Sequence, residues 1–144
     1  MCAVVMNIKK PYIYLIGCMS YYHANNEFQK ATEWRNWFIN QLVPYNFRFF
    51  DPTINFKLNM DKYIGREIVV QNDYYLQKCD IGIINLQDLL KSPGSLYELF
   101  NFKFNNKPVI AFGELFAQPH VNSAIAAHFS TKEEIRDYLI TMYV

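Results

Sequence analysis

Short apolar runs alternate along the chain with amphipathic segments. The runs are predicted to be strands, because each is too short for a typical helix and is bounded by Gly, Pro, Asn or Asp. Between them, apolar residues return every three or four positions, as in helices that bury one face. The predicted strands are residues 12–16, 48–50, 81–84, 109–112 and 128–129. The predicted helices are residues 26–42, 65–78, the segment between Gly94 and Asn105, and residues 130–142.

The order of these elements predicts the fold class. Strands and helices alternate, which favours parallel strands joined by right-handed crossovers. The chain is therefore predicted to be α/β, a three-layer doubly wound fold (flavodoxin/Rossmann-like) with a mostly parallel sheet of about five strands. Its length of 144 residues suits one domain over residues 1–144, with no linker or repeat. Residues 54–64 and 114–123 are predicted to be loops.

The apolar stripes also predict which side of each helix is buried. In the first helix, Trp34 or Arg35 falls on the stripe. The start of the last helix is predicted by a capping-box pattern, with Ser130 as N-cap and Glu133 at the third helical position. The inner positions of the second helix are predicted to be Ile68, Val69, Leu76 and Cys79, with Asn72 and Asp73 within or beside them, and those of the last helix are Ile135, Tyr138, Leu139 and Met142.

Charge and cysteine content narrow the class of protein. The net charge of +1 gives no overall attraction to nucleic acid or membranes. Three cysteines without CxxC spacing and three scattered histidines make a disulfide framework or a metal site unexpected. Apolar runs are too short to span a membrane, and the first residues lack the order of a signal peptide. A cytosolic protein without metal or cofactor is the prediction.

Candidate binding residues gather where strands end and helices begin. In parallel α/β sheets, ligands bind at the carboxyl ends of the strands. No P-loop, Gly-x-Gly fingerprint or GxSxG elbow is present to specify the ligand. The candidates on this edge are Tyr14, Gly17, Asp51, Asn85, Ser92, Gly94, Ser95 and Glu98.

Two carboxylates form the best chemical pair. Glu98 lies in the first turn of a helix among apolar neighbours, so it must be solvated, paired or used. The helix start also favours its ionised form. With Asp73 as the second group, the pair suits glycosyl transfer with retention, which needs a nucleophile and an acid/base. The alternative is two unrelated surface carboxylates.

Several segments, in this order, resemble the nucleoside 2-deoxyribosyltransferase family. Ser-Pro-Gly-Ser-Leu-Tyr-Glu-Leu at 92–99, followed by Lys-Pro-Val-Ile at 107–110, carries most of the resemblance. The other matching pieces are IYLIG at 13–17, TEWR at 32–35, FFDPT at 49–53, VVQNDYYLQKCDIGIINLQ at 69–87 and FSTKEEIRDYL at 129–139. Together they cover nearly the whole chain.

The resemblance implies a role for three residues. Glu98 falls on the family's nucleophile, which attacks the anomeric carbon of the deoxyribose. Asp73 falls on the acid/base that protonates the departing nucleobase, and Tyr14 on the tyrosine that orients the nucleophile. The implied activity is transfer of deoxyribose between nucleobases through a covalent glycosyl-glutamate, without a cofactor. The implied partners are nucleosides, nucleobases and further copies of the chain, in a homo-oligomer with shared active sites.

One position departs from the family's pattern. Many members carry an aspartate six residues before the nucleophile, where this chain has Ser92. A serine there resembles the related nucleoside 5′-monophosphate N-glycosidases, whose serines help to hold the phosphate. Those hydrolases also have an arginine-rich loop after the first strand, whereas this chain has no Arg between Gly17 and Trp34. Deoxyribosyl transfer is therefore the first hypothesis, hydrolysis of monophosphates the second, and a non-catalytic nucleotide-binding protein the third.

Overall fold

The computed structural model describes residues 9–54 and 65–144. The predicted loop at 54–64 thus lies, apart from Ile54, outside the described residues. Every predicted strand and long helix is present in the described part, within a few residues of its predicted bounds. The strands are β1 (Tyr12–Ile16), β2 (Arg48–Phe50), β3 (Ile81–Asn85), β4 (Val109–Phe112) and β5 (Ala127–Phe129). The helices are α1 (Ser20–Ala24), α2 (Gln29–Leu42), α4 (Gly65–Lys78), α5 (Pro93–Phe104), α6 (Pro119–Ser123) and α7 (Lys132–Tyr143), with short 3₁₀ helices at Val43–Tyr45 and Leu89–Lys91.

The sheet confirms the predicted fold class. Its five strands lie in the order β2-β1-β3-β4-β5, and all four pairings are parallel. The chain moves outward from β1 to β2 and then returns to the other side of β1 to form β3. That reversal is the point at which doubly wound sheets open a ligand crevice, beyond the carboxyl ends of the two central strands. We refer to this border of the sheet as the carboxyl edge.

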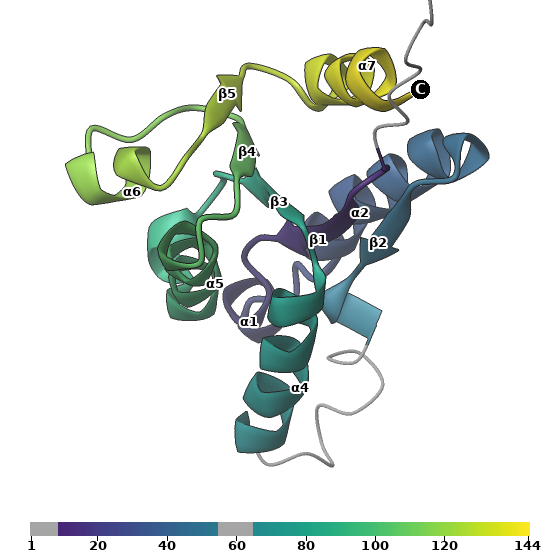
Figure 1. Cartoon of the computed structure of the whole chain (residues 1–144). Coiled ribbons are helices and arrows are strands. Elements are labelled where there is room, and N and C mark those ends of the chain that lie inside the picture. Colours follow the sequence, from purple (N-terminus) through teal and green to yellow (C-terminus); the bar gives the residue numbers. More distant parts are fainter. Residues whose placement is uncertain (1–8, 55–64) are drawn as a thin grey trace, which may run out of the picture.

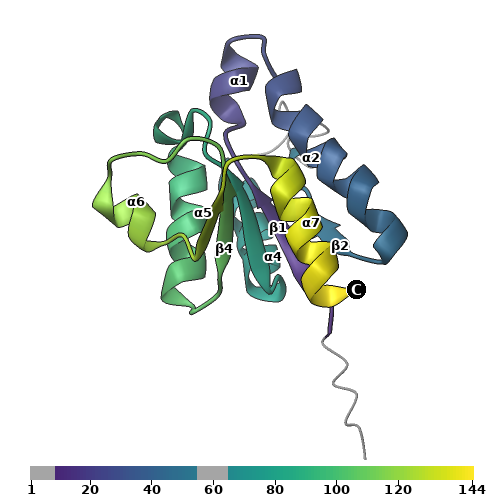
Figure 2. The same ribbon diagram turned by 90° about the horizontal axis from the view of Figure 1, so that it is seen from above.

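Helices cover both faces of the sheet, as Figures 1 and 2 show. Side chains alternate along β1, so that Tyr14 and Ile16 face α4 and α5, while Ile13 and Leu15 face α2 and α7. All five residues of β3 are buried. This burial of both faces explains the continuous apolar runs that identified the strands.

Predictions about two side-chain orientations, one loop and one helix cap were wrong. Val69 is 50% exposed and Met142 is 46% exposed, although both were assigned to inner stripes. The predicted loop at 114–123 contains α6, whose first residue is a helix-starting proline. The N-cap of α7 is Thr131 rather than Ser130, and its hydroxyl accepts a hydrogen bond from the backbone of Glu134. The sequence satisfies the capping pattern in both registers, one residue apart.

Candidate active site

A cavity of about 330 Å³ opens at the carboxyl edge, beside β1 and β3. We call it the edge cavity. Three segments form its wall: the loop after β1, the face of α4, and the start of α5 with the residues just before it. The lining residues are Gly17, Met19, Ser20, Ile68, Val69, Asn72, Asp73, Lys91, Ser92, Pro93, Gly94, Ser95, Tyr97 and Glu98. The structure thus brings together six of the predicted site residues in one cavity, namely Gly17, Asp73, Ser92, Gly94, Ser95 and Glu98. Val69 lines this cavity, which explains why an apolar residue of α4 is exposed.

Glu98 is the buried acid of the edge cavity. It is the sixth residue of α5, so it lies in the second turn and not in the predicted first turn, beyond the reach of the helix start. Glu98 is only 7% exposed, and its Oε2 atom is buried without a hydrogen-bond partner. Burial raises the pKa of Glu98, Tyr14 and Arg35 lower it, and the nearby charge of Asp73 raises it, so that the pKa is about 7. An unpartnered carboxyl oxygen is costly unless a ligand uses it. Glu98 therefore has the free oxygen that a nucleophile requires.

Tyr14 lies beside Glu98 without lining the cavity. Its hydroxyl is fully buried and also makes no hydrogen bond of standard geometry. Burial and then the charge of Glu98 raise the pKa of Tyr14 well above its ordinary value. The phenol consequently keeps its proton at neutral pH, and it favours the ionised form of Glu98. The two unpaired groups are suited to pairing with each other or with a ligand.

Arg35 is a functional candidate that the sequence analysis did not single out. Its guanidinium is fully buried and donates to the backbone oxygens of Leu15 (3.4 Å), Gly17 (3.0 Å) and Ala31 (2.6 Å). Burial lowers the pKa of Arg35 to about 10, against the opposing effects of Asp51 and Glu98, so it stays charged at neutral pH. The available signal was a cation on the buried stripe of a helix, which is rare without a partner.

Asp51 supports Arg35 rather than lining the edge cavity. Its Oδ1 atom lies 3.8 Å from Arg35 Nε and accepts hydrogen bonds from the backbone and hydroxyl of Thr53, at 2.9 Å and 2.5 Å. Asp51 is 6% exposed. The carboxylate therefore holds the guanidinium and closes the turn after β2.

Asn85 belongs to a different hollow. It lines a cavity of about 500 Å³ together with Trp34 and Lys132, on the side of α2 and α7. Its Oδ1 atom accepts a hydrogen bond from the backbone of Gln87 at 3.0 Å. Side chains alternate along a strand, so Asn85 and Ile84 face opposite sides of the sheet. The structure thus separates Asn85 from Glu98, although both lie at the carboxyl edge.

The start of α5 presents two hydroxyl groups to the edge cavity. Ser92 is the N-cap of α5, where its side chain accepts from the backbone of Ser95, and the two Oγ atoms lie 2.6 Å apart. Gly94 has open space around the position of a Cβ atom. Lys91 is the one cation among the described lining residues, and its Nζ atom contacts the Tyr21 hydroxyl at 3.0 Å.

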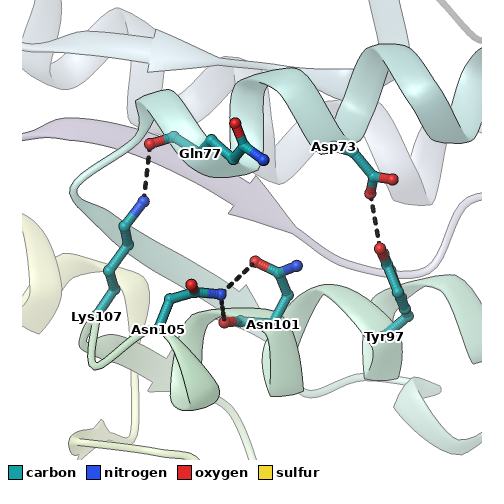
Figure 3. A pocket seen from close by; sticks show the side chains of 6 residues that line it. All are labelled: Asp73, Gln77, Tyr97, Asn101, Asn105 and Lys107. Atoms are coloured by element: carbon teal, nitrogen blue, oxygen red, sulfur yellow. Dashed lines mark hydrogen bonds between the residues drawn. The ribbon is translucent and has the colours of Figure 1, made fainter.

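Asp73 stands between the edge cavity and a second one. The second cavity also measures about 330 Å³, and we call it the polar cavity. Tyr97 shares this position, because it too lines both cavities. Its hydroxyl donates to Asp73 Oδ1 at 2.9 Å, as Figure 3 shows. The polar cavity is lined by Asp73, Gln77, Tyr97, Asn101, Asn105 and Lys107.

The described residues show neither a metal-binding cluster nor a membrane-spanning helix. Within residues 9–54 and 65–144, no group of three His, Cys, Asp or Glu side chains is arranged to hold a metal ion. None of the helices in this part of the chain is long and apolar enough to cross a membrane.

Solved structures provide the comparison with known proteins. One similar structure is a 2-deoxyribosyltransferase from Bacillus psychrosaccharolyticus, with a TM-score of 0.68 over 88% of this chain and 91% of that one. The chain shares the fold of this enzyme. Their sequences are 20% identical, so the likeness concerns the fold alone. A conserved protein from Enterococcus faecalis is also similar, with a TM-score of 0.71, 12% identity, and coverage of 92% of this chain and 99% of that one. No protein-family model and no curated protein matches the sequence.

Proposed function

We propose that this protein is a nucleoside 2-deoxyribosyltransferase, which cleaves the N-glycosidic bond of a 2′-deoxynucleoside and transfers the deoxyribosyl group to another nucleobase. One observation carries the proposal: Glu98 presents a buried, unpartnered oxygen in the same cavity as Asp73. The fold shared with a 2-deoxyribosyltransferase supports it. A double displacement through a carboxylate nucleophile needs no metal or cofactor.

In the first step, Glu98 attacks the anomeric carbon of the deoxyribose. An ester bond forms to the carboxylate oxygen, and the bond between carbon and base nitrogen breaks with its electron pair going to the base. Asp73 supplies the proton that the departing base takes up. In the second step, the incoming base displaces Glu98 and returns a proton to Asp73. Two displacements on one carbon retain its configuration.

The neighbours of Glu98 favour the ionised form that this step needs. Tyr14 and Arg35 both lower the pKa of Glu98, whereas burial raises it. We assign Tyr14 the role of orienting the nucleophile through its hydroxyl. Gly17, Ser92, Gly94 and Ser95 are the proposed contacts to the sugar and base, since all four line the edge cavity.

Base exchange tests this proposal directly. The protein is incubated with a purine or pyrimidine deoxynucleoside and a second base, and exchange is followed by chromatography. Glu98→Gln is expected to abolish exchange, while Glu33→Gln, an exposed glutamate on α2, leaves it unchanged. Mass spectrometry of the wild-type protein with substrate alone should detect a deoxyribosyl adduct on Glu98. Exchange that persists undiminished in Glu98→Gln would contradict this mechanism.

A second candidate is hydrolysis of nucleoside 5′-monophosphates. The position of Lys91 beside Ser92 and Ser95 favours it, because a cation and two hydroxyls suit a phosphate. Under this alternative, base is released from deoxynucleoside monophosphates but not from free nucleosides. Lys91→Met then raises KM for the monophosphate, whereas Lys103→Met, which removes a lysine bonded to Ser123 outside the edge cavity, does not.

The remaining expectations concern assembly and a non-catalytic role. That the chain forms a homo-oligomer with shared active sites stays a prediction, and light scattering of the purified protein measures the mass of the assembly. A cytosolic location also stays a prediction. The third hypothesis, a protein that binds nucleotides without turning them over, was raised by Ser92. Turnover that is lost in Glu98→Gln excludes it.

A further inference from the structure

Tyr97 has an unusual position relative to both proposed catalytic carboxylates. It precedes Glu98 in α5, and its hydroxyl reaches across to α4, where it donates to Asp73 Oδ1 at 2.9 Å. The residue is 50% exposed, and together with Asp73 it borders both the edge cavity and the polar cavity. Figure 3 shows the bond bridging the two helices. The pair therefore forms part of the partition between these hollows.

We propose that Tyr97 is a positioning residue that holds Asp73 in the orientation required to protonate the departing base. The inference rests on the proposed function and adds to it a residue that acts through Asp73. By holding Oδ1, the Tyr97 hydroxyl leaves Oδ2 as the oxygen that can exchange a proton with the base. An aspartate side chain without such a partner has a broad torsional preference at its carboxylate.

The location of the bond favours positioning over simple helix attachment. A separate tie joins the end of α4 to the segment after α5, because Lys107 Nζ donates to the backbone oxygens of Leu76 (3.0 Å) and Gln77 (2.9 Å). Loss of the Tyr97 hydroxyl therefore leaves that attachment intact. What Tyr97→Phe removes is the restraint on Asp73, since the ring itself stays in place.

A comparison of leaving groups separates positioning from a structural effect. The base of 2′-deoxyguanosine needs a proton as it leaves, whereas that of 7-methyl-2′-deoxyguanosine already carries a positive charge and leaves without one. Acid/base assistance is typically worth ~10²–10⁴-fold, so loss of its positioning should lower kcat by about tenfold or more. We expect Tyr97→Phe to show this loss for 2′-deoxyguanosine with KM little changed, and to release the methylated base at the wild-type rate.

Three further variants complete the experiment. Tyr97→Phe combined with Asp73→Asn should be no slower than Asp73→Asn alone, because both changes remove one function. Lys107→Met is the matched structural control and should not distinguish the two substrates. The inference is overturned if Tyr97→Phe keeps the wild-type kcat, or if it slows both substrates equally. Wild-type protein that releases the base of neither purine nor pyrimidine deoxynucleosides overturns the proposed function and this inference with it, which is a different result from a uniform effect of Tyr97→Phe.

Discussion

The buried carboxyl group of Glu98 is the proposed nucleophile, and its burial also lowers the stability of the folded protein at neutral pH. Its ordinary pKa is 4.5 and burial raises it to about 7 in the folded protein. Between these two values the folded protein keeps a proton that the unfolded chain releases. The contribution of Glu98 to the free energy of unfolding therefore falls as pH rises from about 4.5 to about 7, and then levels off. One pKa unit corresponds to about 1.4 kcal/mol, so the loss amounts to roughly 3 kcal/mol.

Glu98→Gln is consequently predicted to be more stable than the wild type above pH 7. The neutral amide has no charge to desolvate, and we expect a gain of about 1–3 kcal/mol at pH 8 and little change at pH 4.5. Urea unfolding at both pH values measures this difference. Glu33→Gln serves as control, because this exposed glutamate should leave the pH dependence as it is in the wild type. A Glu98→Gln protein that follows the wild-type stability at both pH values contradicts the prediction.

Two glycines of the edge cavity differ in what surrounds them. A Cβ atom on Gly17 would lie 2.7 Å from Trp34 Cζ2 and 3.3 Å from Arg35 Nη2, whereas one on Gly94 would meet nothing within 4 Å. The close approach of α2 to the end of β1 thus depends on Gly17. We predict that Gly17→Ala lowers the free energy of unfolding by about 1–3 kcal/mol, in the range of overpacked cores.

Gly94→Ala is the matched control for Gly17→Ala. Gly94 lies in the first turn of α5, where alanine is at least as favourable as glycine, so stability should stay within about 0.5 kcal/mol or rise. Thermal or urea unfolding of the two variants provides the comparison. Equal losses at both positions would show that the packing against Trp34 is not what restricts Gly17.

The elements themselves were predictable because their apolar periods are strong. The bounds of α4 and of β1 were predicted without error, but the orientation of some side chains was not. β3 is buried on both faces, so its sequence has no alternation that shows which side Asn85 faces. Glu98 was identified because a carboxylate among apolar residues needs an explanation. Arg35 was missed because its partners, the strand-end carbonyls and Asp51, become neighbours only in the folded sheet.

Across the whole molecule, Arg35 connects the layers that meet at the carboxyl edge. It belongs to α2, on one face of the sheet, yet its charge lowers the pKa of Glu98 in α5, on the other. Two of its acceptors are the backbone oxygens of Leu15 in β1 and of Gly17 just after it, and its ion pair reaches the segment after β2. Because the strand order reverses next to β1, one cation at the carboxyl edge is close to α5, to the end of β1 and to the segment after β2. Stability and the ionisation of the proposed nucleophile are thereby linked.

Arg35→Met is predicted to disturb both properties. Removing one partner of a buried ion pair typically costs about 3–5 kcal/mol, and here three backbone oxygens also lose a hydrogen bond from the guanidinium. Since Arg35 lowers the pKa of Glu98, its loss should raise that pKa, so the proposed exchange activity should fall more at pH 6 than at pH 8. Urea unfolding and rates at the two pH values measure these effects.

Arg136→Met provides the control for this change. Arg136 also pairs with an aspartate, Asp137 at 3.0 Å, but at the surface of α7, where such pairs contribute about 0–1 kcal/mol. A second test adds Asp51→Asn to Arg35→Met, which removes the carboxylate left without its cation and should recover part of the lost stability. If Arg35→Met were no more damaging than Arg136→Met, or if its activity fell equally at both pH values, Arg35 would not connect the fold to the ionisation of Glu98.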